Sequence, residues 1–253
     1  MNRTVLITGA TSGIGEAAAR AFAANGDALV LCGRRMDRLE SLKRELEAKG
    51  ASVYIFALDV RDRKSVETAL PKVLEEIAPI DVLINNAGLA RGLETFQESD
   101  LDDLDTMLDT NVKGLIYVTR AVLPQMIERD AGHIINIGST AAIFAYGRGH
   151  VYCASKAAVK TVTDGIRIDT MATNIKVTNV QPGTTKTEFA AVRHHGDRAK
   201  GDATYANAEP LLPENVADIL LYIANQPRWV QITDVTVTAT KQAPGLPIVR
   251  TNA

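Results

Sequence analysis

The stretch Thr8-Gly9-Ala10-Thr11-Ser12-Gly13-Ile14-Gly15 decides the fold of this chain. It follows a β-rich run at residues 5–8 and leads into a helical pattern that continues to about residue 25. The three glycines leave no Cβ where the backbone must turn and where a pyrophosphate must come close. The following helix offers free N–H groups and a positive dipole end to that phosphate. Its place between strand and helix favours a dinucleotide site over an ordinary glycine-rich turn.

Working outward from this loop, β-rich runs alternate with helical patterns along the whole chain. The runs lie at 5–8, 28–32, 53–58, 82–84, 133–137, 176–180 and 234–237. The helical patterns lie at 14–25, 37–49, 64–77, 100–128, 151–172 and 213–225. Such alternation predicts an α/β fold: a doubly wound, Rossmann-like domain with a seven-stranded parallel sheet and helices on both faces. No repeat or linker divides residues 1–253, so we expect a single domain.

Composition narrows the class of protein. Of 253 residues, 46% are hydrophobic, which is enough for a full core and excludes disorder. The net charge of −2 argues against a nucleic-acid partner. Two cysteines cannot form a disulfide framework, no apolar run is long enough to span a membrane, and the first residues do not resemble a secretory signal. We therefore expect a cytoplasmic protein without membrane association.

The second β-rich run ends in Gly33-Arg34-Arg35, where an adenosine ribose lies in folds of this type. A cofactor with a free 2′-hydroxyl usually meets an acidic residue there, about 20 residues after the glycine loop. Two guanidinium groups instead attract a 2′-phosphate through charge and paired hydrogen bonds. The sequence thus favours NADP(H) over NAD(H). The argument is stronger for Arg34, because Arg35 is equally compatible with the solvated start of a helix.

Tyr152 and Lys156 lie four residues apart in a helical pattern and therefore share a face. A nearby ammonium favours the phenolate, so we expect a lowered tyrosine pKa and a role in proton transfer. Ser139 ends the run at 133–137 and is expected at the crevice where ligands bind in such sheets. Each feature alone has a structural explanation, as a packed aromatic or a turn residue. Together with the glycine loop they indicate an active site.

The chain resembles the short-chain dehydrogenase/reductase family over nearly its whole length. The matching motifs are the TGxxxGxG loop at 8–15, Asn85-Asn86-Ala87-Gly88, Ser139 thirteen residues before Tyr152, Tyr152-x-x-x-Lys156, and Pro182-Gly183. The resemblance implies that Tyr152 transfers a proton to or from the substrate oxygen and that Ser139 hydrogen-bonds it. It implies that Lys156 lowers the tyrosine pKa and holds the nicotinamide ribose. It also implies that Asn111 supports a water path to Lys156.

The implied catalytic set is thus Asn111, Ser139, Tyr152 and Lys156. The predicted NADP(H)-binding residues are Gly9, Thr11, Ser12, Gly13, Ile14, Gly15, Arg34, Arg35, Asp59, Val60, Asn86, Ala87, Gly88, Tyr152, Lys156, Pro182, Gly183, Thr184, Thr185 and Thr187. No metal is expected, because His133, His150, His194 and His195 do not form a credible ligand set. We interpret Cys153 as a packing residue, since adjacent helix positions point about 100° apart.

Residues 119–124 and 133–140 resemble the NADP-dependent 3-hydroxy acid, or serine-type, dehydrogenase branch of the family. This implies hydride transfer between NADP(H) and a small alcohol or carbonyl substrate (EC 1.1.1.-), with a 3-hydroxy acid or serine-like compound as the first choice. A carbonyl reductase acting on a neutral ketone or aldehyde and a non-catalytic dinucleotide sensor are the alternatives. The intact Tyr152 and Lys156 favour an enzyme over a sensor.

Two further expectations concern the lid and the assembly. The segment 184–210 is polar and lacks periodicity, which favours a substrate lid over a plain surface loop. Its Lys186, Arg193, His194 and Arg198 form either a binding site for a substrate carboxylate or a solvated basic loop. Apolar residues on more than one face of 100–128 and 151–172 suit a helix–helix interface. The family resemblance implies a homotetramer, with a homodimer as the alternative.

Overall fold

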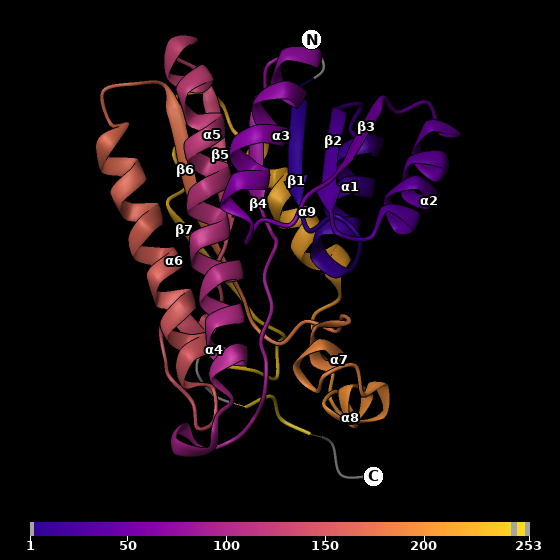
Figure 1. Ribbon diagram of the computed structural model, residues 1–253, viewed down its shortest axis with the longest axis vertical. Helices are drawn as coiled ribbons and strands as arrows, with labels where there is room; N and C mark the ends of the chain where they lie inside the picture. Colours follow the sequence, from indigo (N-terminus) through magenta and orange to yellow (C-terminus); the bar gives the residue numbers. More distant parts are fainter. Residues whose placement is uncertain (1–2, 244–246, 251–253) are drawn as a thin grey trace.

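The computed structural model describes residues 3–243 and 247–250 and contains a parallel sheet of seven strands (Figure 1). The strands are β1 (Thr4–Thr8), β2 (Ala28–Gly33), β3 (Val53–Ala57), β4 (Val82–Asn85), β5 (Gly132–Ile137), β6 (Ile175–Pro182) and β7 (Asp234–Val237). Their order in the sheet is β3-β2-β1-β4-β5-β6-β7. The winding direction reverses between β1 and β4, and this switch point is where such folds bind ligands. The predicted doubly wound architecture is confirmed.

Helices cover both faces of this sheet (Figure 1). One layer consists of α1 (Gly13–Ala24), α2 (Met36–Glu47) and α9 (Pro213–Ala224). The other contains α3 (Arg63–Glu76), α5 (Leu115–Glu128) and α6 (His150–Asp169). Within β1 the side chains alternate between the layers: Val5 and Ile7 belong to the cluster with α1, α2 and α9, whereas Leu6 belongs to the cluster with α3 and α5. All three are fully buried, as expected for a sheet covered on both faces.

The segment 100–128, predicted as one helix, consists of three consecutive parts: α4 (Leu101–Leu108), a π-helical turn η2 (Asp109–Gly114) and α5. A Cβ on Gly114 would lie 2.6 Å from the side chain of Val60, so the turn approaches the chain beyond β3 closely. Such wider turns are rare and often occur at functional sites. This one carries Asn111 and brings it towards the carboxyl ends of the strands.

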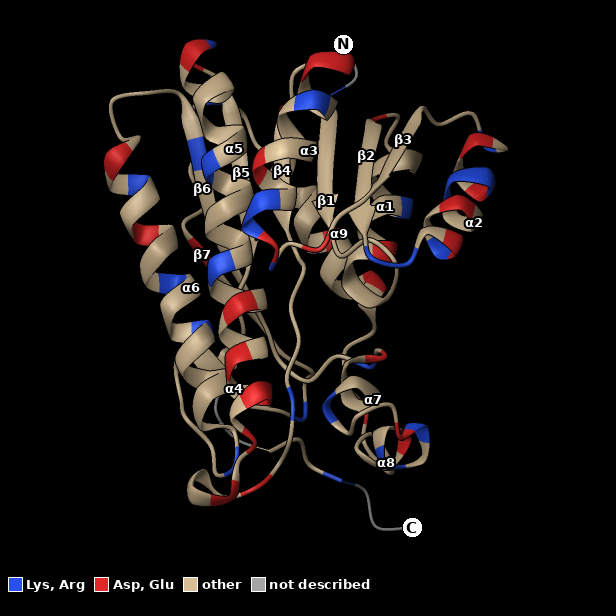
Figure 2. Ribbon diagram, in the orientation of Figure 1, with Lys and Arg blue, Asp and Glu red and all other residues tan. Residues whose placement is uncertain are grey.

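The segment 184–210, which we call the lid segment, lies beyond those carboxyl ends (Figure 1). It was expected as an aperiodic loop but contains two short helices, α7 (Phe189–Arg193) and α8 (Arg198–Ala203). The chain after β7 holds it from outside: Ile248 is buried, and Arg250 donates hydrogen bonds to the carbonyls of Thr204 and Ala206. Figure 2 shows basic residues in the ribbon just before α2, acidic residues along α4 and mixed charges on α8.

Among residues 3–243 and 247–250, no helix combines the length and the apolar character that crossing a membrane requires.

Candidate active site

The glycine loop joins β1 to α1 and adopts the backbone that its glycines permit. Gly9 and Gly13 have φ angles of +66° and +55°, which favour glycine over residues with a side chain. A Cβ on Gly15 would lie 2.5 Å from the carbonyl oxygen of Gly9 and would also meet the Asn86 amide. The loop is therefore closed against the chain that follows β4. It opens the first turn of α1, where free N–H groups can receive a phosphate.

A cleft of about 820 Å³ extends from this loop to the lid segment. Gly15 alone among the predicted cofactor residues does not line it, because it packs within the loop. The others line the cleft: Gly9, Thr11, Ser12, Gly13, Ile14, Arg34, Arg35, Asp59, Val60, Asn86, Ala87, Gly88, Tyr152, Lys156, Pro182, Gly183, Thr184, Thr185 and Thr187. A cleft with a glycine cradle at one end and a Tyr–Lys pair at the other fits a dinucleotide.

The two arginines after β2 have different surroundings. Arg34 is exposed on the cleft, and within the described residues no hydrogen bond engages its guanidinium. Arg35 is half-buried and fully engaged: Nη2 and Nε donate to Thr11 Oγ1 at 3.0 and 3.1 Å, and Nη2 donates to Ser12 Oγ at 2.9 Å. Its Nη1 donates to Glu188 Oε2 at 2.9 Å. Arg34 is therefore the guanidinium available to a 2′-phosphate, and Arg35 joins the glycine loop to the lid segment.

The walls beside the adenosine position are fixed by hydrogen bonds. Arg61 binds the Asp59 carboxylate at 2.6 Å, and this hydrogen bond lowers the pKa of Asp59. Asn86 donates its side-chain amide to the carbonyls of Thr8 and Gly9 at 3.0 and 3.1 Å. The segment Asn85-Asn86-Ala87-Gly88, which we call the NNAG segment, therefore holds the glycine loop as well as lining the cleft.

Tyr152 and Lys156 lie on the buried face of α6, at the opposite end of the cleft from Arg34. Burial raises the pKa of the Tyr152 phenol, against the opposing effect of a hydrogen bond with Ser139. Lys156 Nζ donates to the Ile137 carbonyl at 2.8 Å, and burial lowers its pKa to about 8. The expected lowering of the tyrosine pKa is therefore wrong for this structure. The physical reason is that loss of water around the phenol dominates, while the ammonium is bonded to a strand carbonyl.

Ser139 and Asn111 complete the predicted set. Ser139 Oγ accepts a hydrogen bond from the Ala141 amide at 3.1 Å, which leaves its hydroxyl hydrogen free to donate. Asn111 is 2% exposed and does not line the cleft. Its amide donates to the Leu89 carbonyl at 2.8 Å and to Ser155 Oγ at 3.0 Å. The π-helical turn is thereby joined to both the chain after β4 and to α6.

The lid segment contacts Tyr152 through α7. The Phe189 and Tyr152 rings meet edge to face with centroids 5.5 Å apart, and the Arg193 guanidinium lies 5.5 Å from the centre of the same tyrosine ring. Arg193 also donates to Tyr146 Oη at 2.8 Å. Of the four basic lid residues, Arg193 and His194 line the cleft, whereas Lys186 and Arg198 do not.

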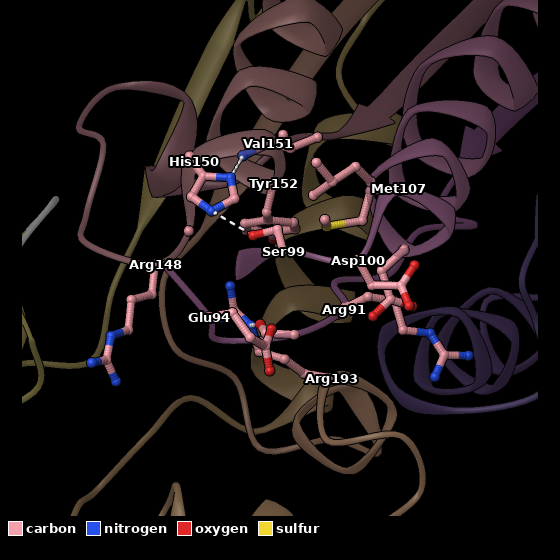
Figure 3. Close-up of a pocket in the computed structure, with 14 residues that line it drawn as sticks. Arg91, Glu94, Ser99, Asp100, Met107, Arg148, His150, Val151, Tyr152 and Arg193 are labelled. Carbon is pink, nitrogen blue, oxygen red and sulfur yellow. Dashed lines mark hydrogen bonds between the residues drawn. The ribbon is translucent and has the colours of Figure 1, made fainter. Parts of the chain in front are cut away.

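A second, much smaller depression lies beside Tyr152 and is lined by Arg91, Arg148 and Arg193 together with acidic residues (Figure 3). Its free volume is about 10 Å³, which leaves no room for a substrate. His150 closes it by a 3.2 Å contact with Ser99. Arg193 lies against the Tyr152 ring, whereas the guanidinium groups of Arg91 and Arg148 point away from it (Figure 3).

The remaining candidates have structural surroundings. Cys153 is buried next to Tyr152 in the cluster formed by α4, α6 and the chain after β4, as expected for packing. His133 is buried in β5, where Nε2 lies 2.9 Å from Thr178 Oγ1, and burial lowers its pKa to about 3. Within the described residues no three His, Cys, Asp or Glu side chains form a metal-binding group.

Sequence reasoning missed three residues of this site: Arg38, Glu188 and Gln242. Arg38 Nη1 and Arg35 Nη1 both donate to the Glu188 carboxylate, at 2.8 and 2.9 Å. Gln242, after β7, accepts a hydrogen bond from the Thr184 amide at 2.8 Å and fixes the start of the lid segment. No local motif marks these residues, because each acts on a partner more than 50 positions away.

A family model for short-chain dehydrogenases matches residues 3–197. The chain belongs to the short-chain dehydrogenase family. Its membership agrees with the glycine loop, the NNAG segment and the Tyr152–Lys156 pair in one cleft. The predicted family, fold and class of oxidoreductase are thereby confirmed.

Individual relatives of this short-chain dehydrogenase extend over almost the whole chain. The NADP-dependent 3-hydroxy acid dehydrogenase YdfG of Salmonella typhi is 45% identical over 240 residues, covering 94% of this chain and 96% of the relative. Sulfoacetaldehyde reductase 2 of Chromohalobacter salexigens is 46% identical over 244 residues, covering 96% of each. A closed form of a serine dehydrogenase complexed with NADP+ superimposes with a TM-score of 0.91 at 44% identity, covering 98% of this chain and 100% of the other.

Proposed function

We propose that this enzyme transfers hydride between NADP(H) and a small alcohol or carbonyl compound that carries an anionic group, with a 3-hydroxy acid or serine-like substrate as the first candidate. The observation that carries the proposal is the position of Tyr152. Its phenol is buried at one end of the cleft, is hydrogen-bonded with Ser139, and has the Arg193 guanidinium 5.5 Å from the centre of its ring. The free guanidinium of Arg34 lies at the other end and favours a 2′-phosphorylated cofactor.

NADP(H), when bound, supplies or accepts the hydride at its nicotinamide ring. The chain's own residues handle the proton. Tyr152 donates its hydroxyl proton to the carbonyl oxygen in reduction and receives it back in oxidation. Its raised pKa keeps the proton on the phenol at neutral pH, so the proton is in place before reduction begins. Ser139, whose Oγ accepts from the Ala141 amide, can direct its hydroxyl hydrogen to the same substrate oxygen and fix its position.

Lys156 and Asn111 act behind the tyrosine in this proposal. One Nζ hydrogen of Lys156 is directed to the Ile137 carbonyl, so two remain for the nicotinamide ribose and for exchange with the tyrosine. Asn111 fixes the π-helical turn beside Lys156: a Cβ on Gly88 would lie 3.2 Å from Asn111 Oδ1 and 3.4 Å from Lys156 Nζ. This proximity supports a water path between the two side chains.

Arg193 supports the anionic class of substrate. It is the lid cation that both lines the cleft and lies against the tyrosine ring, so a carboxylate or sulfonate a few atoms from the reacting carbon can reach it. Two relatives are named for small anionic substrates, one for 3-hydroxy acids and one for sulfoacetaldehyde. Sulfoacetaldehyde is therefore the second candidate.

A substrate panel that follows NADPH absorbance tests the proposal. We expect activity on L-serine, 3-hydroxypropionate or sulfoacetaldehyde, and much less on neutral alcohols and aldehydes of the same length. Tyr152→Phe should lower turnover by about 10²–10⁴-fold with NADP+ binding preserved. Activity on neutral compounds alone would instead identify a carbonyl reductase. NADP+ binding without turnover of any substrate would identify a dinucleotide sensor, and near-normal turnover of Tyr152→Phe would refute the catalytic assignment.

We also propose a cytoplasmic homotetramer, with a homodimer as the alternative. Ile116 and Ile127 on α5 and Ile168 on α6 are 37%, 49% and 66% exposed, which supports a helix–helix interface. Light scattering on the purified enzyme distinguishes a tetramer from a dimer or a monomer.

A further inference from the structure

Glu188 joins three segments that are far apart in the sequence. Its carboxylate accepts hydrogen bonds from Arg35 at 2.9 Å and from Arg38 at 2.8 Å. Arg35 in turn donates to Thr11 and Ser12 of the glycine loop. One lid carboxylate is therefore bonded to the start of α2 and, through Arg35, to the phosphate end of the cleft.

The same residue is the N-cap of α7, whose five residues end at Arg193. The helix is thus held at both ends: Glu188 meets the two arginines, and Arg193 lies against Tyr152 and donates to Tyr146. Phe189, directly after Glu188, packs edge to face on the Tyr152 ring. A displacement at Glu188 must therefore move the lid groups that touch the tyrosine.

We propose that Glu188 is a positioning residue: its bridge to Arg35 and Arg38 latches the lid segment to the adenosine end of the cleft and holds Phe189 and Arg193 in place over Tyr152. The latch persists when the cofactor is bound, because Arg34 is the guanidinium left for the 2′-phosphate. The inference rests on the proposed function for its kinetic consequence, whereas its structural consequence is independent of any reaction.

Arg38 makes the proposal testable without altering the phosphate site, because its side chain does not line the cleft. The three side chains of the bridge are 37–40% exposed, so each ion pair is of moderate strength. Among the described residues, no other carboxylate of the lid segment is bonded to two guanidinium groups, so neither Asp197 nor Glu209 can replace Glu188 in this bridge. Loss of either Glu188 or Arg38 should loosen the same contact.

The experiment compares Glu188→Gln, Arg38→Gln and the double variant by limited trypsin digestion of the whole enzyme with saturating NADP+. Peptide mapping follows cleavage after Arg193 and Arg198. We expect Glu188→Gln to be cleaved about fivefold faster than the unmodified enzyme, since exposed pairs of this kind shift local opening by such amounts. Arg38→Gln should be accelerated less, because it keeps the Arg35–Glu188 pair. The double variant should be cleaved no faster than Glu188→Gln, because loss of the Glu188 carboxylate already removes both of its ion pairs.

Kinetics give the second measurement. We expect the KM for the anionic substrate to rise by about fivefold in Glu188→Gln and by less in Arg38→Gln, with a smaller change in kcat, because the lid groups bind substrate while the tyrosine stays in α6. Glu209→Gln is the matched control: Glu209 also lies in the lid segment and pairs with Lys241 at 3.1 Å, but its side chain is 73% exposed. It should leave both the digestion rate and KM unchanged.

Two results would overturn the latch. The first is an unchanged digestion rate in Glu188→Gln combined with tighter binding of 2′,5′-ADP. That result would mean that the negative charge of Glu188 weakens phosphate binding and does not hold the lid segment. The second is additive acceleration in the double variant. Failure of the proposed function has a different signature, since loss of turnover on every substrate would leave the digestion result intact.

Discussion

The glycine loop and the lid segment line one cleft and meet at Gly13 and Thr187, but they are built differently. The loop depends on its own backbone: Gly9 and Gly13 adopt positive φ angles, and Gly15 packs on the Gly9 carbonyl. The lid segment depends on distant partners, because Glu188 bonds to Arg35 across 153 positions and Arg193 bonds to Tyr146 across 47. A binding site set by backbone conformation is visible in a short motif, whereas one set by side chains from separate segments is not.

The largest effect is expected from a substitution in the glycine loop. Gly15→Ala places a Cβ against the Gly9 carbonyl, which should cost about 1–3 kcal/mol of strain and weaken NADP+ binding by up to about 100-fold. Isothermal titration calorimetry and thermal unfolding measure the two consequences. Gly165→Ala in α6 is the matched control, because a Cβ there meets nothing within 4 Å. It should preserve binding and leave stability equal or higher; equal behaviour of the two variants would contradict the comparison.

The next largest effect is expected in the lid segment, at Arg193. Arg193→Gln removes a charged donor beside Tyr152 and should raise the KM for an acidic substrate by about 10-fold or more, since such bonds contribute about 1.5–3 kcal/mol. Steady-state kinetics measure it, with NADP+ affinity as the internal reference. Lys186→Gln, at a lid cation outside the cleft, should change neither value. A loss of NADP+ affinity in Arg193→Gln would show that Arg193 contributes to cofactor binding as well as to substrate binding.

A smaller effect separates the two arginines after β2. Arg34→Gln should weaken NADP+ binding by about tenfold and leave NAD+ binding unchanged, because an exposed charged hydrogen bond is lost. Fluorescence titration with both cofactors measures the change in preference. Equal affinity of the variant and the parent enzyme for NADP+ would contradict the assignment to Arg34 and indicate that Arg35 binds the 2′-phosphate.

The smallest effect at neutral pH lies at the opposite end of the strands, in His133. Burial lowers its pKa from 6.5 to about 3, so between these values the unfolded chain binds a proton that the folded chain does not. Stability therefore falls as pH drops below about 6.5, by up to about 1.4 kcal/mol per pH unit. Urea unfolding from pH 7 to pH 4 should show this slope, and His133→Gln should reduce it. An identical slope in the variant would assign the acid sensitivity to other groups.

The sequence predicted the frame of this protein well, for reasons that particular residues illustrate. Val5, Leu6 and Ile7 form an apolar run followed by glycines, and their alternate burial in two layers follows from strand geometry alone. The predicted cofactor residues other than Gly15 line one cleft because parallel strands end at the same edge of the sheet. The π-helical turn at Asn111 was missed, because its register differs from that of an α-helix only through contacts with Gly88, Val60 and α6.

The sequence by itself determined the doubly wound sheet, the glycine loop and the position of Tyr152 four residues before Lys156, since local periodicity and backbone freedom encode them. Tertiary structure decided the direction of the Tyr152 pKa, because burial of the phenol outweighs its hydrogen bond with Ser139, while the Lys156 ammonium is bonded to the Ile137 carbonyl. It also decided that Arg35 is bonded to the lid segment, whereas the Arg34 guanidinium stays available in the cleft. Adjacent residues with the same side chain differ only in which distant groups the fold brings to them.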